Sequence, residues 1–328
     1  MSTPVIVKPS IWSRLPLIRE LKQSVGWQRG MLIAGLVIIA IFLLTAIFAE
    51  WLAPFGYSQL SDKNGTFGAQ LPPGGAHLLG TTVGGYDVFS RVIWGAQTAA
   101  LVIIIAVMLS VFAGVILGLV SGYFGGWLDR VLVVVADAVY AFPSLLLAIV
   151  MSIVISGGRS GLFTGLMAAA ISITVVFIPQ YFRVIRSETV RMKAEAFVES
   201  AKVIGASNAR VMFRHVLRNS TRTLPLILTL NASEAILTLA GLGFLGFGIE
   251  PTAAAEWGFD LNKSISDVAA GIWWTSIFPG TAIVLVVLGI TLVGESLNDL
   301  ADPRLRTRHR ALTSGAGQTD VDELEENL

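Results

Sequence analysis

Few residues in this chain could do chemistry, and most of them are scattered. There is no cysteine, which excludes disulfides, thiolate metal sites and cysteine nucleophiles. The three histidines, His77, His215 and His309, lack the spacing of metal ligands. No GxxxxGK[ST] segment is present to cradle nucleotide phosphates. We therefore expect no catalytic site, cofactor site, metal site or nucleic-acid partner for this chain.

One polar cluster, formed by Asn231, Ser233 and Glu234, interrupts an otherwise apolar stretch. An acidic side chain at membrane depth usually faces a cavity or a partner. The first interpretation is that these residues line a translocation path. The second is that they make internal hydrogen bonds to a neighbouring helix.

A second polar stretch, ESAKVIGASNARVMFRHVLRN, occupies residues 199–219. Between Ala194 and Ile204, the apolar residues Phe197, Ala201 and Ile204 recur at helical spacing. This spacing predicts a short amphipathic helix with these residues on its apolar face. Gly205 can adopt the left-handed conformation that ends a helix.

A second short helix is predicted after that glycine. Ser207 or Asn208 can cap it, and it would run through Val211, Met212 and Val216. From physics alone, this pair of helices could also lie on the anionic inner leaflet as a basic amphipathic element.

The elements around these residues must be membrane helices. Only 14% of the residues are charged, against roughly 25% in soluble domains. A helix needs about 20 apolar residues to cross the hydrocarbon layer. Asp129, Arg130 and Asp137 crowd the start of the third stretch, where the alternative is an interfacial helix that enters the membrane near Pro143. The six predicted spans are 31–50, 98–121, 134–156, 163–183, 224–248 and 277–297.

The distribution of basic residues predicts the orientation of these spans, because Lys and Arg in short loops favour the cytoplasm. The tail before residue 30 and the segment 183–222 are rich in both, and a basic residue at the bilayer centre costs about 2.5 to 3.5 kcal/mol. The segments 51–97 and 250–276 hold few basic residues and should face outside. Both termini and the loop 184–222 are then cytoplasmic.

The second predicted span carries Gly114, Gly118 and Gly122 at intervals of four residues. Small residues at this spacing let helix backbones approach closely in a membrane. We interpret them as helix-packing residues, either within the chain or against a partner, rather than as ligands.

Four stretches together resemble one family. The order Glu199, Ser200, Ala201, three residues, then Gly205 resembles the EAAxxxG signature of the membrane subunits of ATP-binding-cassette importers. HLLGTTVGGYDVFSR (77–91), GASNARVMFRHVLRN, LGFLGFGIEPTAAAEWG and DPRLR (302–306) resemble patterns of the dipeptide and oligopeptide permease subunits of the C type. The resemblance covers roughly residues 30–306.

The resemblance implies that the loop is a coupling helix seated in a cleft of a cytoplasmic ATPase subunit. A small apolar face at Ala201 would permit close docking, the Glu199 carboxylate would pair with a basic group, and Gly205 would set the turn. The residues that the resemblance assigns to ATPase coupling are Glu199, Ser200, Ala201, Ile204, Gly205, Ala206 and Arg214.

The implied fold is an all-α integral membrane protein with six transmembrane helices, the type I (MetI-like) importer permease fold, in the inner membrane. The implied partners are a homologous second permease subunit, ATPase subunits that carry ATP and Mg²⁺, an extracytoplasmic substrate-binding protein and a peptide substrate. The expected organisation is a cytoplasmic tail (1–30), a first helix with an external loop (31–97), a permease core (98–306) and a disordered tail (307–328). An interfacial helix around Trp12 to Trp27 could brace the first span.

The sequence leaves three alternative functions open. The same machinery could import nickel, haem, glycopeptides or another solute. A secondary transporter driven by protons or sodium would need ionisable groups inside the bundle, for which Glu234 is the one strong candidate. A scaffold without transport would leave the coupling-helix signature unexplained.

Overall fold

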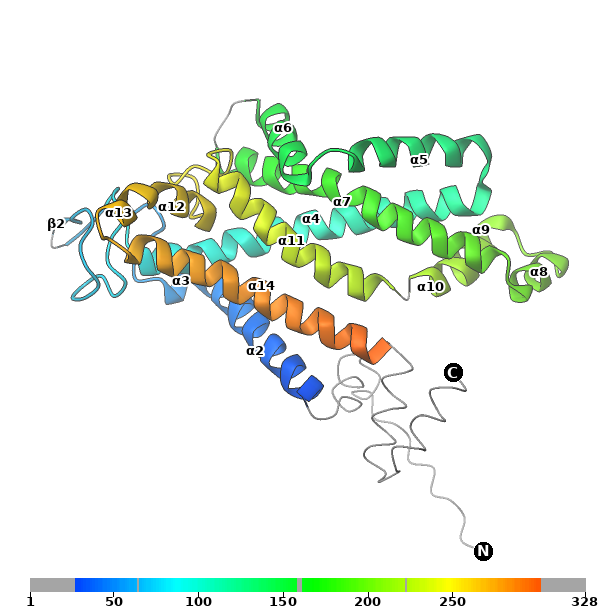
Figure 1. The fold of residues 1–328 in the computed structure, drawn as a ribbon, viewed down its shortest axis with the longest axis horizontal. Coiled ribbons are helices and arrows are strands. Elements are labelled where there is room, and N and C mark those ends of the chain that lie inside the picture. The colour runs from blue at the N-terminus through cyan, green and yellow to red at the C-terminus, as the bar shows by residue number, and fades with distance from the viewer. Residues whose placement is uncertain (1–26, 64, 158–160, 222, 302–328) are drawn as a thin grey trace, which may run out of the picture.

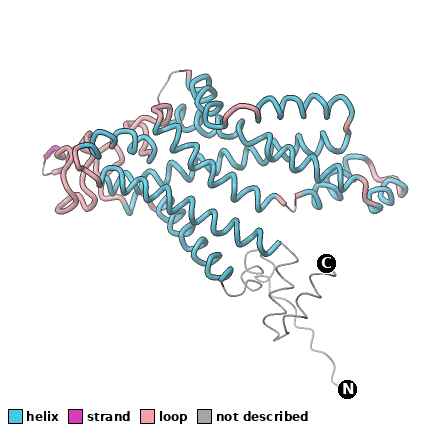
Figure 2. The backbone as a smooth tube through the Cα atoms, viewed as in Figure 1, coloured by secondary structure: helices cyan, strands magenta, loops and turns pink. Residues whose placement is uncertain are grey.

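Long helices packed along one axis make up most of the chain (Figures 1 and 2). The computed structural model describes residues 27–63, 65–157, 161–221 and 223–301. The predicted interfacial helix before Trp27 and the predicted disordered tail at 307–328 lie outside these residues. Five of the described helices are long and apolar enough to cross a membrane, and one bent pair brings the number to six. The prediction of an all-α membrane protein is confirmed.

Five long helices form the body of the bundle, with α4 and α7 in the most extensive contact. Their shared core includes Val102, Ile173, Phe177 and Ile236, all buried. Burying such side chains stabilises a chain by about 1.5–3 kcal/mol each in water, whereas in lipid the close fit of the helices matters more. These helices are α2 (Trp27–Ile47), α4 (Val88–Phe124), α7 (Leu162–Lys193), α11 (Leu224–Phe244) and α14 (Trp274–Ala301).

Shorter elements gather at the two ends of the bundle (Figure 1). A two-stranded antiparallel sheet pairs Ser61 with Thr66 and Asp62 with Gly65, and it was not predicted. At one end lie α3 (Ala49–Leu52), β1 (Ser61–Asp62), β2 (Gly65–Thr66), α12 (Trp257–Lys263) and α13 (Ile265–Ala269). At the other end lie α8 (Ala196–Val203), α9 (Asn208–Arg210), the π-helix η2 (Val211–Val216) and α10 (Leu217–Ser220).

The third predicted span, 134–156, is wrong as a single helix. Two helices, α5 (Gly126–Tyr140) and α6 (Ser144–Ser156), meet at a bend of 98° instead. Pro143, with ψ 125°, lies outside the helical region directly before α6. Proline lacks the N–H that would continue α5, and it also disfavours the helical conformation in the residue before it. The two helices therefore break at this point. The break near Pro143 that the alternative interpretation required is therefore present.

The predicted end of the fourth span at residue 183 is also wrong, since α7 continues to Lys193. Its basic side chains are matched by acids on α5: Arg183 pairs with Asp137 at 2.7 Å, and Arg186 pairs with Asp129. These pairs let the helix continue through a charged stretch. The cytoplasmic loop predicted at 184–222 is accordingly shorter, and we call residues 194–221 the basic segment.

The ends of α4 and α11 also differ from those of the predicted spans. α4 has 37 residues, about 55 Å at 1.5 Å per residue, so it extends well beyond the predicted span 98–121 and beyond a hydrocarbon layer of about 30 Å. α11 ends at Phe244 rather than 248, because Gly246 adopts φ +83° and the Phe247 N–H donates back to the Leu242 carbonyl at 2.8 Å.

Candidate functional site

The basic segment projects from the end of α4 and α7, opposite the end that holds the sheet (Figure 1). Its first helix, α8, ends as predicted at Gly205, which has φ +83°. The Ala206 N–H donates to the Ala201 carbonyl at 3.0 Å, the backbone bond that closes a helix over a left-handed residue. The glycine thus fixes the turn between the two halves of the segment.

The predicted apolar face of α8 is confirmed for Ala201 and wrong for Phe197 and Ile204. Val198 and Ala201 are the buried residues, whereas Phe197 is exposed and Ile204 is 84% exposed. The spacing of three and four residues fits both faces, and only the contact with the bundle decides between them. Ala201 is 6% exposed and packs inward against the buried cluster that includes Val211 and Met212 of η2, so it is not part of an outer docking surface.

Residues 207–216, which form α9 and η2, attach the basic segment to the bundle. Ser207 caps α9 by accepting from the Arg210 N–H at 3.4 Å, and the predicted helix through Val211, Met212 and Val216 is present. These three side chains are buried. The stretch 211–216 is a π-helix, a widened turn that is frequent at functional sites.

Tyr123, near the end of α4, ties the two halves together. Its hydroxyl donates to Asn208 Oδ1 at 3.0 Å, and the Lys193 ammonium donates to its carbonyl. Lys202 of α8 lies over its ring at 5.9 Å from the centroid. The segment is therefore packed onto the ends of α4 and α7 through one buried cluster, which contains Leu119, Ile185 and their buried neighbours.

The outer surface of the segment carries apolar and charged groups side by side. Val203 is 86% exposed and Ile204 84% exposed at the projecting end of α8. Exposed apolar groups with a charged rim are typical of a surface that contacts another protein. Of the residues assigned to ATPase coupling, Glu199, Ser200, Ile204, Gly205 and Arg214 are exposed, Ala206 is half-buried and Ala201 is buried.

The glycine ladder of α4 lies against α7. A Cβ added at Gly114 would approach Tyr181 Cβ to 2.4 Å, one at Gly118 would approach the Phe182 carbonyl to 2.7 Å, and one at Gly122 would approach the Arg186 carbonyl to 2.8 Å. Only glycine permits such backbone contact. The ladder fixes α4 to α7 directly above the basic segment.

The polar cluster of α11 does not converge on one place. Ser233 Oγ lies 3.3 Å from Thr291 Oγ1 of α14, so it takes part in a contact between two helices. Asn231 is buried inside the bundle, at 2% exposure. Glu234 instead lines a cavity of about 190 Å³ between α5, α6, α7 and α11. Of the three residues, Glu234 alone lines that cavity.

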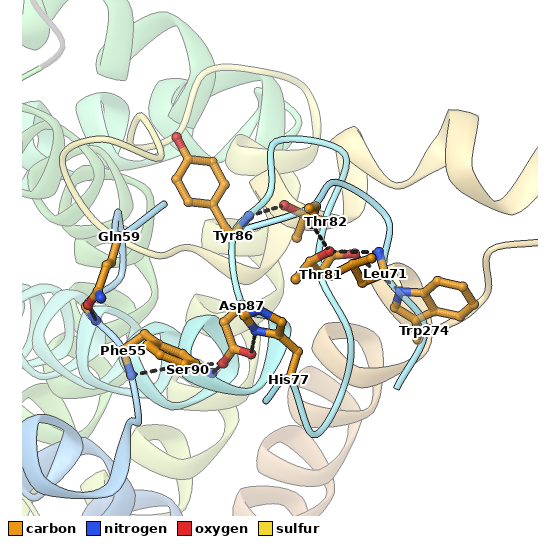
Figure 3. A network of polar contacts seen from close by, with 12 residues as sticks. Phe55, Gln59, Leu71, His77, Thr81, Thr82, Tyr86, Asp87, Ser90 and Trp274 are labelled. Atoms are coloured by element: carbon orange, nitrogen blue, oxygen red, sulfur yellow. Dashed lines mark hydrogen bonds and ion pairs between the residues drawn. The ribbon is translucent and has the colours of Figure 1, made fainter. Parts of the chain in front are cut away.

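The opposite end of the bundle is held by buried polar contacts that use the residues of the 77–91 motif (Figure 3). His77 Nδ1 lies 2.9 Å from Asp87 Oδ1, and Asp87 caps α4 by accepting from the Ser90 N–H at 2.8 Å. The Phe55 N–H donates to Ser90 Oγ at 3.1 Å. The motif therefore ties the loop before α4 to the start of that helix.

Arg91 extends this network to the segment after α11. Its guanidinium pairs with Asp260 of α12 at 2.7 Å and donates to the Tyr57 carbonyl at 3.0 Å. Glu256 caps α12 by accepting from the N–H groups of Gly258 and Phe259. Burial raises the pKa of the Glu256 carboxyl to about 8, against the opposing effect of these two backbone donors.

The sequence analysis quoted Glu256 and Trp257 only as part of the motif that ends at Gly258 and gave no role to them or to Asp260. A signal existed for Asp260, because Arg91 lies at the start of an apolar stretch and a buried charge requires a partner. Which acid supplies that partner depends on how α12 folds back onto α4, where the Trp257 Nε1–H donates to the Val92 carbonyl at 3.0 Å. Nothing in the local sequence encodes that contact.

Comparison with known families finds two matches along the chain. The family described as the binding-protein-dependent transport system inner membrane component matches residues 114–307. The N-terminal transmembrane domain of oligopeptide transport permease C matches residues 28–73. The first match includes the glycine ladder, the basic segment and α11.

Among similar proteins is a dipeptide transport system permease protein, DppC, of Alkalihalophilus pseudofirmus. It is 36% identical over 275 residues, which are 84% of this chain and 86% of that protein. The glutathione transport system permease protein GsiD of Shigella flexneri is 32% identical over 91% of this chain and 97% of its own length. The protein of that name from Salmonella typhimurium is 35% identical over 88% of this chain and 91% of its own length.

Proposed function

The chain belongs to the family of inner membrane components of binding-protein-dependent transport systems, and from this premise we propose that it forms half of the translocation pathway of an ATP-driven peptide importer. The other half is a homologous permease subunit. ATPase subunits that hold ATP and Mg²⁺ bind the basic segment, and a substrate-binding protein delivers peptide at the opposite end. The relatives named for dipeptide and glutathione transport support a short peptide as cargo.

The observation that carries this proposal is the basic segment itself. It presents exposed Val203 and Ile204 next to the exposed Glu199 and is rigidly attached to α4 and α7. A cleft on an ATPase subunit would cover the apolar side chains and pair with the carboxylate. The basic segment lies at one end of the bundle, and α12 and the start of α4, which carry Asp260 and Arg91, lie at the other (Figure 1). A chain that contacts one partner on each side of a membrane needs this arrangement.

The coupling then follows from packing. When the ATPase subunits close, they push the basic segment, and the buried cluster around Tyr123 passes that displacement to α4. The glycine ladder holds α4 against α7, so the two helices tilt together. Because α5 pairs with α7 through Asp129 and Asp137, the wall of the cavity that contains Glu234 moves with them.

The experiment is purification from native membranes in mild detergent, followed by identification of the co-eluting chains and an ATPase assay. We expect a P-loop protein and a second permease to co-elute, and ATP hydrolysis to increase when a loaded peptide-binding protein is added. Recovery of the chain alone, with uptake driven by an ion gradient, would contradict the proposal.

A further inference from the structure

Glu234 is an acidic residue in the middle of a membrane helix. It follows Leu224 by ten residues and precedes Phe244 by ten, which places it about 15 Å from either end of α11. Among the described residues, no basic side chain pairs with its carboxylate and no side chain donates a hydrogen bond to it. A carboxylate at this depth costs several kcal/mol unless it meets a cation, a proton or water.

The cavity around Glu234 is polar and partly open. Gln180 of α7 lines it together with Ser144, Tyr140 and Phe142. Tyr140 and Phe142 are more than half exposed, so the cavity opens on the face of the bundle formed by α5 and α7. Its volume of about 190 Å³ is below the 300–1,000 Å³ of pockets that enclose a whole ligand, which suits one end of an extended molecule.

The face onto which the cavity opens does not suit contact with lipid. Arg183 lies three residues beyond Gln180 on α7, and its side chain is 44% exposed and paired with Asp137, whose side chain is 56% exposed. Arg183 also stacks on the Tyr140 ring at 4.3 Å from the centroid. Exposed charges along a membrane helix face water or a partner. The cavity therefore belongs to a hydrated surface.

The chemistry of the lining selects a cation. The Glu234 carboxylate and the Gln180 amide oxygen are acceptors. Phe142 and Tyr140, whose ring also stacks on Arg183, belong to the same lining, and aromatic rings attract positive charge. An ammonium group supplies three donors and one positive charge, which match this set. We propose that Glu234, with Gln180 and Tyr140, binds the α-ammonium group of a peptide during its passage through the membrane. This inference rests on the proposed function for the identity of the cargo.

The test uses the absence of cysteine in this chain. Ser144→Cys places a thiol in the cavity with little change in shape, and Ser156→Cys at the far end of α6 is the matched probe outside it. The complete complex, purified without its binding protein, is treated with a cationic and an anionic methanethiosulfonate reagent of equal size. Mass spectrometry measures the rate of modification of this chain.

We expect the cationic reagent to modify Ser144→Cys about tenfold faster than the anionic one, because Glu234 lines the same cavity and its carboxylate attracts cations there. Adding Glu234→Gln should bring the ratio to about one, while the ratio at Ser156→Cys stays unchanged. Dialanine at high concentration should slow modification at Ser144→Cys, and N-acetyl-dialanine should not. Val139→Cys provides a second thiol on the cavity wall.

Several results would overturn the assignment. Equal rates for the two reagents, or no response to Glu234→Gln, would mean that the carboxylate is neutralised, for example by a basic side chain of the second permease. Equal protection by both peptides would exclude the α-ammonium group as the ligand. Modification of Ser156→Cys but of neither Ser144→Cys nor Val139→Cys would show that the cavity is closed to an ammonium group. ATP-driven uptake is measured separately, with the same variants reconstituted in proteoliposomes together with the binding protein. Uptake without a charge preference at Ser144→Cys would contradict this inference alone, whereas a charge preference without uptake would contradict the proposed function.

Discussion

At the scale of single residues, Glu199 carries the most specific expectation of the sequence. It is exposed on α8 and lies four residues before the exposed Val203. We predict that Glu199→Arg leaves the protein inserted and folded but lowers ATPase binding and reduces uptake at least tenfold, because it places a cation against the basic partner group. Co-purification and uptake are measured at matched expression. Glu195→Arg, the same change of charge at the start of α8, is the control, and normal uptake by Glu199→Arg would exclude the role.

Gly243 illustrates how closely the outer segment fits against α11. A Cβ at this position would approach Glu256 Oε2 to 1.6 Å, whereas one at Gly241 would meet only the flexible end of Leu145 at 3.0 Å. Gly243→Ala should destabilise the protein by about 1–3 kcal/mol through overpacking. Gly241→Ala should be nearly neutral. Thermal unfolding in detergent compares the two, and equal melting temperatures would contradict the packing described for Glu256.

The pH dependence of stability follows from Glu256, which lies outside the spanning helices. Its folded pKa of about 8 exceeds its ordinary value of 4.5, so between these values the folded protein holds a proton that the unfolded chain releases. The stability that this carboxyl contributes is fully present below pH 4.5 and is lost as the pH rises to about 8. Glu256→Gln should flatten this part of the stability curve in detergent. An unchanged slope in the variant would show that another group titrates.

At the scale of elements, α4 and α7 act as one unit because of the glycine ladder. A side chain at Gly118 would approach the Phe182 carbonyl and the Arg186 N–H within about 3 Å. We predict that Gly118→Val separates the two helices and costs about 1–3 kcal/mol. Ile116→Val, at a partly exposed position of the same helix, is the control. The measurement is the melting temperature together with hydrogen exchange of the basic segment, which should quicken in Gly118→Val alone.

The elements also show how far sequence reasoning reached. Apolar length predicted that five of the six stretches are single long helices, and the position of Gly205 predicted the end of α8, because each depends on local chemistry. The course of α7 beyond residue 183 was missed, since it depends on carboxylates of α5 that neutralise Arg183 and Arg186 across 46 and 57 residues. On α8, Ala201 was predicted on the inner face but Val198 was not, because two apolar faces share Ala201 and only the contact with the bundle decides between them.

In the candidate sites, too, single residues could be predicted from the sequence, whereas contacts between distant helices could not. The sequence identified Glu234 as unusual but not the cavity that it lines, which is formed by side chains from four helices. Ser233 shares the same stretch of sequence, yet its hydroxyl meets Thr291 of α14. Two neighbouring polar residues on one helix face different partners, because successive residues point about 100° apart around the axis.

At the scale of the whole molecule, the two functional ends lie far apart and are joined by long helices (Figure 1). α4 alone runs from the network around Asp87 to Tyr123 at the basic segment. We propose that a displacement of the basic segment, supplied by ATP hydrolysis in a partner, is carried along this continuous helix and drives peptide across the membrane.

The most direct measurement is uptake of a labelled dipeptide into proteoliposomes that contain the chain with its permease, ATPase and binding-protein partners. We predict that uptake requires ATP on the ATPase side, stops when the ATPase subunits are omitted, and continues when proton and sodium gradients are collapsed. Uptake by the isolated chain along an ion gradient, with no ATPase subunit present, would contradict the account.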